Sequence, residues 1–352
     1  MARRRQAVTM RHVAEDAAVS LQTVSRVLHD DANVRPAMRD RVKASIEKLG
    51  YVPSIAAQRM SGSRSYLLLA LNDRDRTISD WTERQGTDWV DQMLLGGMLK
   101  CAEHGYRMLI ELVDTHSRHV ERELTAAIAA LQPDGIILTP PHSDNDAILS
   151  VLRKQNIPFA RIGSRGEGGG FKLEMNDEGA AAAATGHLIG AGHRSIGFIA
   201  GPQDYALSNW RIAGWQDAMA EAGFETAGLL ARGDFGFESG VAAARQLLAR
   251  EDRPTAIIAS SDQMSLATLE VARELGLGIP RDLSVISFDN TPIVKFASPP
   301  LTAVDQPIAA LTARAAELLI KVQRNPDLAE SDQGTVIPAS LVVRESTDAP
   351  GR

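Results

Sequence analysis

Residues 8–28 read VTMRHVAEDAAVSLQTVSRVL, and this stretch decides the fold of the N-terminal part of the chain. Apolar positions recur at helical spacing on both sides of a short break, which predicts two helices joined by a tight turn. We expect their shared core to consist of Val13, Ala14, Ala17, Val19, Val24, Val27 and Leu28. The outer face of the second helix then carries Leu21, Gln22, Ser25 and Arg26. Because Gln and Arg can bind base edges in the major groove, the stretch predicts a DNA-reading module.

A third helix is expected to follow, because Met38, Val42, Ile46 and Leu49 keep the same period and Gly50 stands where a C-cap belongs. Residues 54–65 then hold one or two possible helical turns and a polar linker. A helix this short is not stable alone in water, so it would fold only against a partner. We therefore expect a DNA-binding domain over residues 1–52 and a separate connecting segment over 53–65.

Charge is distributed unevenly along the 352 residues. Residues 1–65 carry a formal net charge of +6 and residues 66–352 one of −12. A basic head suits a polyanion, and an acidic body resists indiscriminate binding to DNA. A single cysteine, Cys101, fits a reducing compartment. No secretory signal and no run of about 18 apolar residues is found, so we expect a cytoplasmic protein without membrane contact.

From residue 66 onward, predicted strands and helices alternate. The first series has strands at 66–71, 106–113, 135–139 and 158–162, with helices at 90–103, 118–131 and 144–155. After a glycine-rich break at 165–170 the alternation resumes at 171–175 and runs to a strand at 284–288, followed by a helix at 307–323 and a strand-like stretch at 335–344. This rhythm predicts an α/β body with two doubly wound parallel-sheet lobes behind an all-α head. We expect one lobe from 66–162 with 291–324, and the other from 163–290 with 325–346.

Two such lobes form a cleft, and ligands of open α/β sheets bind at the carboxyl ends of the strands. The residues that follow the predicted strands are mostly neutral polar groups and carboxylates: Asn72, Asp73, Thr139, Gly163, Asn176, Gly201, Ser261, Asp262, Asp289 and Asn290. This set suits a hydroxyl-rich ligand better than a phosphate.

From about residue 8 to residue 346 the chain resembles the LacI/GalR family of bacterial transcription factors, whose body is periplasmic-binding-protein-like. The resemblance rests on the head motif, on LGYVP at 49–53, and on later landmarks such as SDQMSL at 261–266 and PPLTAVDQP at 299–307. It implies a homodimeric regulator, most often a repressor, on a pseudo-palindromic operator in double-stranded DNA. Its operator affinity would be controlled allosterically by a small effector, which we expect to be a sugar.

The resemblance also assigns DNA contacts. Leu21, Gln22 and Arg26 match the base-reading positions, with Arg26 suited to a guanine. The positions that hold phosphates are matched by Thr9, Ser20, Thr23, Ser25, Asn33 and Tyr51. In the connecting segment, Ala57 and Met60 match a hinge helix that enters the minor groove, with Met60 as the wedge between base pairs. Two departures are expected to weaken the head: Ala18 replaces the usual turn glycine, and Arg35 replaces the Ser or Thr that caps the third helix.

For the effector, the resemblance implies contacts by Trp89, Arg211, Phe235, Ser261, Asp289 and Gln306. An arginine and a carboxylate facing each other over an aromatic ring would match the polar edges and apolar face of a pyranose. In the empty protein, Arg211 and Asp289 could instead form a salt bridge. Gly163 stands where some members have an aspartate, which removes one anchor for a hydroxyl.

Other functions remain open at this point. The same regulator fold could respond to a purine or to a phosphoprotein co-regulator, and a periplasmic-type sugar-binding protein is a distant alternative. We predict no enzyme, cofactor or metal site. His116 and His119 form a single pair, and the glycines at 166–170 lack the Lys-Ser/Thr of a phosphate-binding loop.

Overall fold

A computed structural model describes residues 8–28, 31, 33–51, 64–83, 88–115, 117–328 and 334–350. It divides the chain into two compact units, residues 1–65 and 66–352. The predicted helix of the connecting segment, with Ala57 and Met60, lies outside the described residues. The two units are called the head and the body below.

The head consists of three helices: α1 (Met10–Asp16), α2 (Leu21–Leu28) and α3 (Pro36–Leu49). Their core is the predicted one, with Val13 and Val24 fully buried and Val42 added from α3. Ala18, in the turn between α1 and α2, has a φ of 50°, the left-handed conformation that favours glycine. An alanine there costs about 1 kcal/mol relative to glycine. Gly50 ends α3 at a φ of 60°, and the start of α3 lacks a side-chain cap at Arg35.

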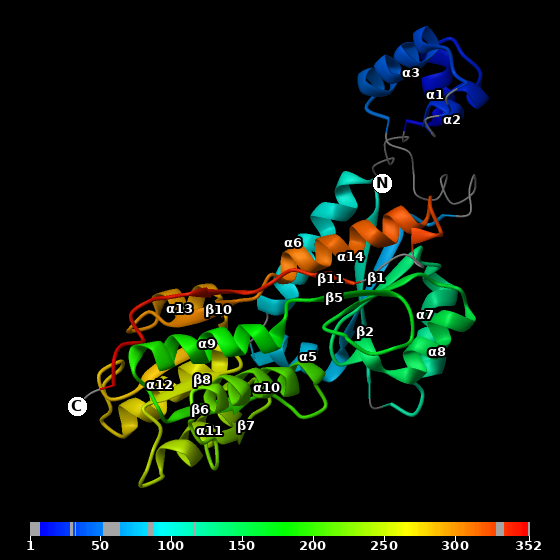
Figure 1. Cartoon of the computed structure of the whole chain (residues 1–352). Helices are drawn as coiled ribbons and strands as arrows, with labels where there is room; N and C mark the ends of the chain where they lie inside the picture. Colours follow the sequence, from blue (N-terminus) through cyan, green and yellow to red (C-terminus); the bar gives the residue numbers. More distant parts are fainter. Residues whose placement is uncertain are drawn as a thin grey trace, which may run out of the picture. The chain divides into compact units, whose positions relative to one another are not determined.

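The first sheet of the body has the strand order β11-β5-β4-β3-β1-β2, and all its pairs are parallel. Its strands are β1 (Leu67–Asp73), β2 (Arg107–Val113), β3 (Gly135–Leu138), β4 (Phe159–Ile162), β5 (Phe171–Glu174) and β11 (Thr335–Val336). The accompanying helices are α5 (Arg74–Glu83), α6 (Asp88–Glu103), α7 (Val120–Leu131), the short η1 (His142–Asp144), α8 (Asp146–Lys154) and α14 (Ile308–Val322). Figure 1 shows them around the sheet.

The second sheet has the order β12-β10-β9-β8-β6-β7, in which only β12 runs antiparallel to its neighbour. Its strands are β6 (Ile196–Ala200), β7 (Leu230–Arg232), β8 (Ala256–Ala259), β9 (Ser284–Asp289), β10 (Thr302–Asp305) and β12 (Ser340–Val342). Its helices are α9 (Asp177–Ala191), α10 (Ala206–Glu221), α11 (Phe237–Leu248), α12 (Asp262–Glu274) and α13 (Pro292–Phe296). The predicted fold class, a helical head and two α/β lobes, is confirmed.

Alternation of side chains along β1 explains how helices cover both faces of the first sheet. Leu67, Leu69 and Leu71 point to the cluster that contains α7 and α8. Leu68 and Ala70 point to the opposite cluster, which contains α6 and α14. A strand buried on both faces reads as a continuous apolar run, as this one does.

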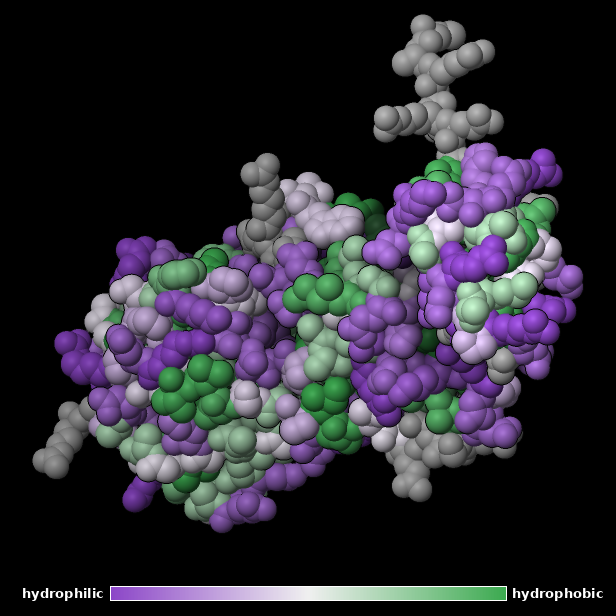
Figure 2. Space-filling model, turned by 90° about the horizontal axis from the view of Figure 1, so that it is seen from above, coloured by the Kyte–Doolittle hydropathy of each residue, from purple (hydrophilic) through white to green (hydrophobic). Residues whose placement is uncertain are grey.

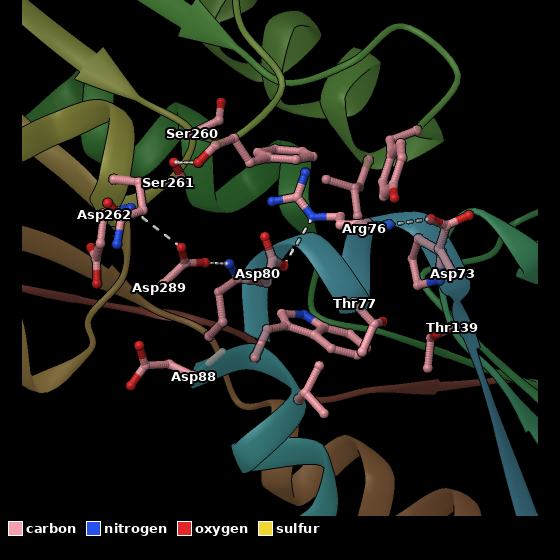
Figure 3. Close-up of a pocket in the computed structure, with 18 of the residues that line it drawn as sticks. Asp73, Arg76, Thr77, Asp80, Asp88, Thr139, Ser260, Ser261, Asp262 and Asp289 are labelled. Carbon is pink, nitrogen blue, oxygen red and sulfur yellow. Dashed lines mark hydrogen bonds and ion pairs between the residues drawn. The ribbon is translucent and has the colours of Figure 1, made fainter. Parts of the chain in front are cut away.

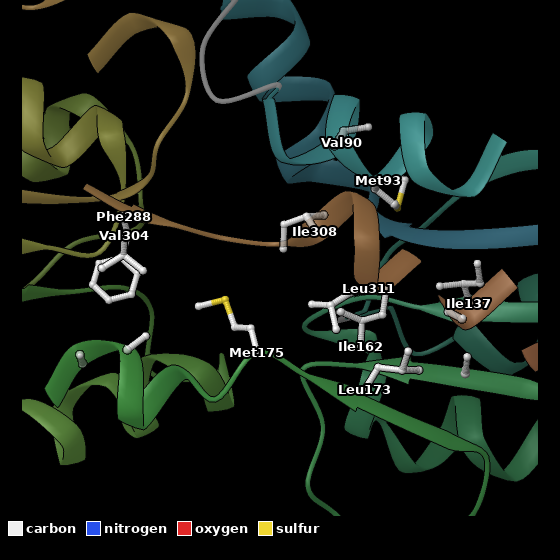
Figure 4. Packing of buried hydrophobic residues seen from close by; sticks show 14 of the residues in the cluster. Val90, Met93, Ile137, Ile162, Leu173, Met175, Phe288, Val304, Ile308 and Leu311 are labelled. Atoms are coloured by element: carbon white, nitrogen blue, oxygen red, sulfur yellow. The ribbon is translucent and has the colours of Figure 1, made fainter. Parts of the chain in front are cut away.

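Helices α6 and α14 pack closely against each other in the first lobe. A Cβ added to Gly96 of α6 would lie 1.9 Å from the main-chain oxygen of Ala309 in α14. The two helices therefore approach to backbone contact, and only glycine fits at that position. Around them, Val90, Met93 and Leu311 belong to a core that continues through Met175 into the second lobe (Figure 4).

The lobe boundaries differ from the predicted ones in three places. β5 pairs with β4 in the first sheet, β10 pairs with β9 in the second, and β11 returns to β5 in the first. The predicted single strand at 335–344 is two strands in different sheets, with Pro338 between them. Proline lacks the N–H that a continuous ladder needs, and here the chain passes from one lobe to the other. Three chain segments within the described residues thus connect the lobes.

Candidate functional site

The exposed face of α2 is the candidate DNA interface of the head. Gln22 and Arg26 are exposed, and the side chain of Leu21 keeps 45% of its surface accessible. The Nε of Arg26 lies 3.8 Å from Oδ2 of Asp31 in a solvent-exposed ion pair. Such a pair is worth about 0–1 kcal/mol, so the guanidinium can readily exchange it for another acceptor.

The predicted phosphate-binding residues of the head have different local contacts. Ser20 caps α2, since the Thr23 N–H donates to its Oγ at 3.1 Å, and the two hydroxyls lie 2.9 Å apart. The Thr9 N–H donates to Nδ1 of His12 at 3.2 Å. Asn33 is exposed and donates to Asp31 from its main-chain and side-chain nitrogens. Ser25 lies half-buried on α2.

Tyr51 occupies a different environment from these residues. It is buried in the core of the head, and this burial raises the pKa of its phenol. Its position is fixed by the helix end, because the Tyr51 N–H donates to the Ile46 carbonyl at 3.0 Å. A contact from Tyr51 to DNA remains a prediction.

In the body, a cavity of about 140 Å³ lies between the two lobes. Strand ends from both sheets meet there, as the Ser260–Asp289 side of Figure 3 faces Asp73, Thr77 and Thr139. The structure brings all six predicted effector residues to this cavity: Trp89, Arg211, Phe235, Ser261, Asp289 and Gln306. Of the residues predicted only from strand ends, Asn72, Asp73, Thr139 and Asp262 also line it, whereas Gly163, Asn176, Gly201 and Asn290 do not.

Arg211 is held at the back of the cavity by three partners. Its Nε donates to Oδ1 of the buried Asp177 at 2.8 Å, and its Nη1 donates to the Ser260 carbonyl at 3.1 Å. Its Nη2 donates to Oε1 of Gln306 at 3.3 Å. The suggested Arg211–Asp289 salt bridge is therefore not formed. Asp177 neutralises the arginine because its carboxylate lies directly against the guanidinium. Sequence spacing does not reveal this partner.

Asp289 and Asp262 form a pair of carboxylates in the second lobe. The Gln306 side-chain amide donates to Asp289, and the Asp262 N–H donates to Oδ2 of Asp289 at 3.3 Å. Burial, and then the charge of Asp289, raise the pKa of Asp262 to about 7. Burial likewise raises the pKa of Asp289, although the Arg211 charge opposes this. The backbone of Asp289 also has a positive φ of 96°, which residues other than glycine seldom adopt.

Phe235 is held by contacts at its ring and at its main-chain carbonyl. A Cβ on Gly201 would lie 2.1 Å from the ring, so glycine is required behind it. The Ser261 hydroxyl donates to the Phe235 carbonyl at 2.8 Å and accepts from the Met264 N–H as the cap of α12. The guanidinium of Arg76 lies over the ring at 5.1 Å from its centroid. Ser261 therefore positions Phe235, and the guanidinium of Arg76 covers one face of this ring.

Arg76 is the main feature of the site that the sequence did not indicate. It lies on α5, which was not predicted, and connects the first lobe to the second by donating to the Asp234 carbonyl. Within α5 its Nε lies 3.5 Å from Oδ2 of Asp80, as Figure 3 shows. The Asp73 carboxylate accepts from the Arg76 N–H at 2.9 Å and so begins the helix. The remaining lining residues are Thr77, Asp88, Val90, Pro140, Tyr205, Leu207, Ser260, Gln263 and Thr291.

The glycine-rich loop at 166–170 has a structural explanation. The buried guanidinium of Arg161 donates to the carbonyls of Gly166, Glu167 and Gly169 and pairs with Asp144. No helix in the described part of the chain is long and apolar enough to span a membrane. Nor do the described residues hold three or more His, Cys, Asp or Glu in a group that could bind a metal ion.

Comparison with known proteins gives matches along nearly the whole chain. The model of bacterial regulatory proteins of the lacI family matches residues 9–54, and the periplasmic binding protein-like domain matches residues 185–347. The chain is 33% identical over 350 residues to the HTH-type transcriptional regulator CelR of Thermobifida fusca, covering 97% of this chain and 99% of CelR. It is 31% identical to the HTH-type transcriptional repressor CytR of Escherichia coli K12, covering 97% of both chains.

Solved structures agree with these relatives. A CelR–cellobiose complex matches with a TM-score of 0.70 and 30% identity, covering 96% of this chain and 99% of that one. The lac repressor dimer bound to operator and the anti-inducer ONPF matches with a TM-score of 0.76 and 25% identity, covering 98% of this chain and all of that one.

Proposed function

The chain belongs to the LacI family of bacterial regulatory proteins, and from this we propose that it represses transcription as a dimer on a pseudo-palindromic operator, under the control of a neutral sugar. The observation that carries the proposal is the presence, in one chain, of an exposed helix-turn-helix face and of a two-lobed cleft lined by all six expected effector residues. The matched relatives are transcriptional regulators rather than enzymes. We place the protein in the cytoplasm, where an operator is accessible.

DNA reading is assigned to α2. In the proposed complex α2 lies in the major groove, where Arg26 reads a guanine and Gln22 a neighbouring base. Leu21 has no hydrogen-bonding group, so we assign it to a thymine methyl group. Ser20, Thr23 and Thr9 lie at the start of α1 and α2, from which they can reach phosphates and set the register.

A dimer is supported by the surface of the body. Apolar patches appear among hydrophilic surface in Figure 2, and α6 exposes Leu95, Met98 and Leu99 with half or more of each surface accessible. Phe296, on α13, is 85% exposed. The three apolar side chains of α6 share one helix face, and such a face is typical of a protein interface. The lac repressor structure that the chain matches is itself a dimer on operator.

The charges around the cavity favour an uncharged effector. Carboxylates line it at Asp73, Asp80, Asp88, Asp262 and Asp289, against the guanidinium groups of Arg76 and Arg211. Both arginines already have carboxylate partners, Asp80 and Asp177. Even with one proton held by the Asp262–Asp289 pair, whose pKa values are raised, a phosphate or carboxylate ligand would meet excess negative charge, whereas sugar hydroxyls can donate to the carboxylates. Trp89 supplies an apolar surface for the face of a pyranose ring.

Coupling between the effector cavity and the DNA-binding head follows from how the two lobes are connected. A ligand hydroxyl that replaces the Asp234 carbonyl or Asp80 as a partner of Arg76 changes the contact between the lobes. The three connecting segments allow the first lobe to rotate against the second. We propose that this rotation changes the spacing of the two heads on operator, so that sugar binding releases DNA.

The test is a selection of binding sites from random duplexes with the full-length protein, followed by fluorescence anisotropy on the selected operator. We expect an inverted repeat, a strong decrease in affinity with salt, and release by at least one neutral sugar. The effector panel also includes hypoxanthine and sugar phosphates. Recovery of no sequence preference would refute the DNA function, and release by only a purine or a phosphorylated compound would refute the neutral-sugar assignment.

A further inference from the structure

Two arginines of the first lobe contact aromatic rings of the second lobe. Arg76, in the first turn of α5, has its guanidinium carbon 5.1 Å from the centroid of the Phe235 ring. Arg165, in the loop between β4 and β5, lies in the same way over Trp210 of α10, at 4.5 Å. We propose that these two contacts form a latch, which holds the lobes in the arrangement that binds operator and opens when the effector binds. The roles of operator and effector rest on the proposed function, whereas the latch can be tested without either.

The Arg76 contact joins two parts that are each fixed within their own lobe. In the first lobe, the Arg76 N–H donates to Oδ1 of Asp73 at 2.9 Å, and Oδ2 of Asp73 accepts from the Thr115 hydroxyl at 3.1 Å. In the second lobe, the Asp234 N–H donates to Oγ of Ser239 at 2.9 Å. Nη1 of Arg76 donates to the Asp234 carbonyl and so connects the two lobes. Because each side is held by its own lobe, rotation of one lobe against the other must break this contact.

The Arg165 contact is built in the same way. Nε of Arg165 donates to Oε2 of Glu174, at the end of β5, at 2.5 Å, and Nη1 donates to Oε2 of Glu178, in α9, at 2.9 Å. Helices α9 and α10 approach to backbone contact here, since a Cβ added to Gly214 would lie 2.0 Å from the Glu178 carbonyl oxygen. Arg165 therefore spans the connecting segment between β5 and α9, and through Glu178 and Trp210 it binds a tightly packed pair of helices in the second lobe.

The direction of the latch follows from the size of the cavity that Arg76 lines. With the latch formed, this cavity measures about 140 Å³, whereas pockets that bind small molecules usually enclose about 300–1,000 Å³. A sugar hydroxyl that binds Arg76 replaces the Asp234 carbonyl, and a sugar too large for the cavity separates the lobes, so either event breaks the contact. Effector binding thus favours the unlatched arrangement. If the effector releases DNA, linkage requires that operator favours the latched one.

The strength of the two contacts suits a reversible switch. A guanidinium over an aromatic ring and a partly exposed ion pair are both weak, so we expect each arginine to favour the latched arrangement by about 3- to 10-fold. The two together then favour it by roughly 10- to 100-fold, which lies within the factor of about 5–150 that is usual for allosteric coupling.

Pulsed EPR distances between two spin labels test the latch without any ligand. Cys101, the single cysteine of the chain, is buried, so labels attach selectively to cysteines introduced on the surface. Lys154→Cys on α8 and Asp217→Cys on α10, both at exposed positions, place one label on each lobe. Labelled full-length protein exchanges subunits with an excess of unlabelled protein, so that distances within one chain dominate.

The labelled protein should show one dominant distance, and the combined Arg76→Ala and Arg165→Ala replacements should add a second. Arg122→Ala, on the exposed surface of α7, is the matched control and should leave the distances unchanged. Distances in the double arginine variant equal to those of the control would overturn the latch.

Calorimetry with glucose, galactose, xylose and cellobiose tests the direction. Arg165 does not line the cavity, so its replacement changes effector affinity only through the lobes. Because the latched arrangement dominates, Arg165→Ala should raise the unlatched fraction, and with it the effector affinity, by about 3- to 10-fold. Operator affinity should fall by less than about twofold, since most of the protein stays latched. Arg165→Lys keeps the charge but loses the planar group over Trp210, so its effector affinity should lie between the two.

The failure of the latch and the failure of the proposed function give different results. Effector binding that is unchanged or weaker in Arg165→Ala would overturn the inference, while release of operator by the same sugar in the unmodified protein would leave the proposed function intact. If no sugar of the panel binds the unmodified protein, the proposed function fails, and the direction of the latch fails with it.

Discussion

Replacement of Asp289 by asparagine separates effector recognition from DNA binding. In the proposed complex, sugar hydroxyls donate to the Asp289 carboxylate at the cavity wall. A hydrogen bond to a charged group contributes about 1.5–3 kcal/mol and one to a neutral group about 0.5–1.5 kcal/mol. The substitution should therefore weaken effector binding by about 1–2 kcal/mol, or roughly 5- to 30-fold.

Asparagine is the right replacement for two structural reasons. The residue has a φ of 96°, and asparagine tolerates positive φ better than alanine, which would add backbone strain. The amide oxygen can still accept the hydrogen bond from Gln306. The substitution removes the like charge beside Asp262 but also the oxygen that accepts from the Asp262 N–H, so the two changes offset each other and we expect thermal stability to be retained.

The assay measures operator affinity by fluorescence anisotropy while the effector is titrated. Asp289→Asn should bind operator as the unmodified protein does and require roughly 5- to 30-fold more effector for release. Asp217→Asn, on the exposed surface of α10, is the matched control and should behave like the unmodified protein. A normal effector response in Asp289→Asn would refute the role of this carboxylate, and a loss of operator binding would refute the separation of the two sites.

Four further predictions concern the head and the body. Arg26→Ala should weaken operator binding by about 1–3 kcal/mol and relax preference at one base pair per half-site, measured by site selection; an unchanged preference would exclude Arg26 as a base reader. Ala18→Gly should stabilise the head by about 1 kcal/mol in denaturant unfolding, because φ is 50° there, and a loss of stability would contradict that strain. Gly96→Ala should destabilise the body, since its Cβ would meet the Ala309 carbonyl at 1.9 Å, and an unchanged melting temperature would show that α6 and α14 can separate. Because the folded-state pKa of Asp262 is raised to about 7, its folded state binds more protons than the unfolded chain, so stability should fall as pH rises from about 4 to 7; Asp262→Asn should lose this slope, and an equal slope in both proteins would contradict the assignment.

The sequence predicted those parts of the fold that repeat a simple pattern. Strands buried on both faces, such as β1, appear as continuous apolar runs, and the helices that cover them keep the 3.6-residue period. The helix α5 was missed because its sequence, RDRTISDWTE, is polar on nearly every side and therefore has no apolar stripe. Its start depends on a hydrogen bond to Asp73, which no periodicity reports. The lobe boundaries were misplaced because strand pairing between distant segments, such as β5 with β11, leaves no local signal.

The site was predictable where residues follow strands or stand in recognisable motifs. Asp289 and Ser261 satisfy both conditions, and the structure places them in one cavity. Partners that lie across the fold were not predictable. Asp177 neutralises Arg211 from a helix 34 residues earlier in the chain, and Arg76 reaches Phe235 from the other lobe. These contacts change the roles assigned to Arg211 and Phe235. Arg211 is already paired with Asp177, and one face of the Phe235 ring is covered by Arg76.

Reciprocal linkage tests most directly whether the cleft controls the head. By thermodynamic necessity, an effector that weakens operator binding by some factor must itself bind the operator complex more weakly by the same factor. Calorimetry would give the effector dissociation constant of the full-length protein alone and of the same protein saturated with its selected operator. We predict a ratio of about 5–150 between these constants, equal to the ratio of operator affinities without and with effector. Identical effector constants in the two states would contradict the coupling on which the proposed function depends.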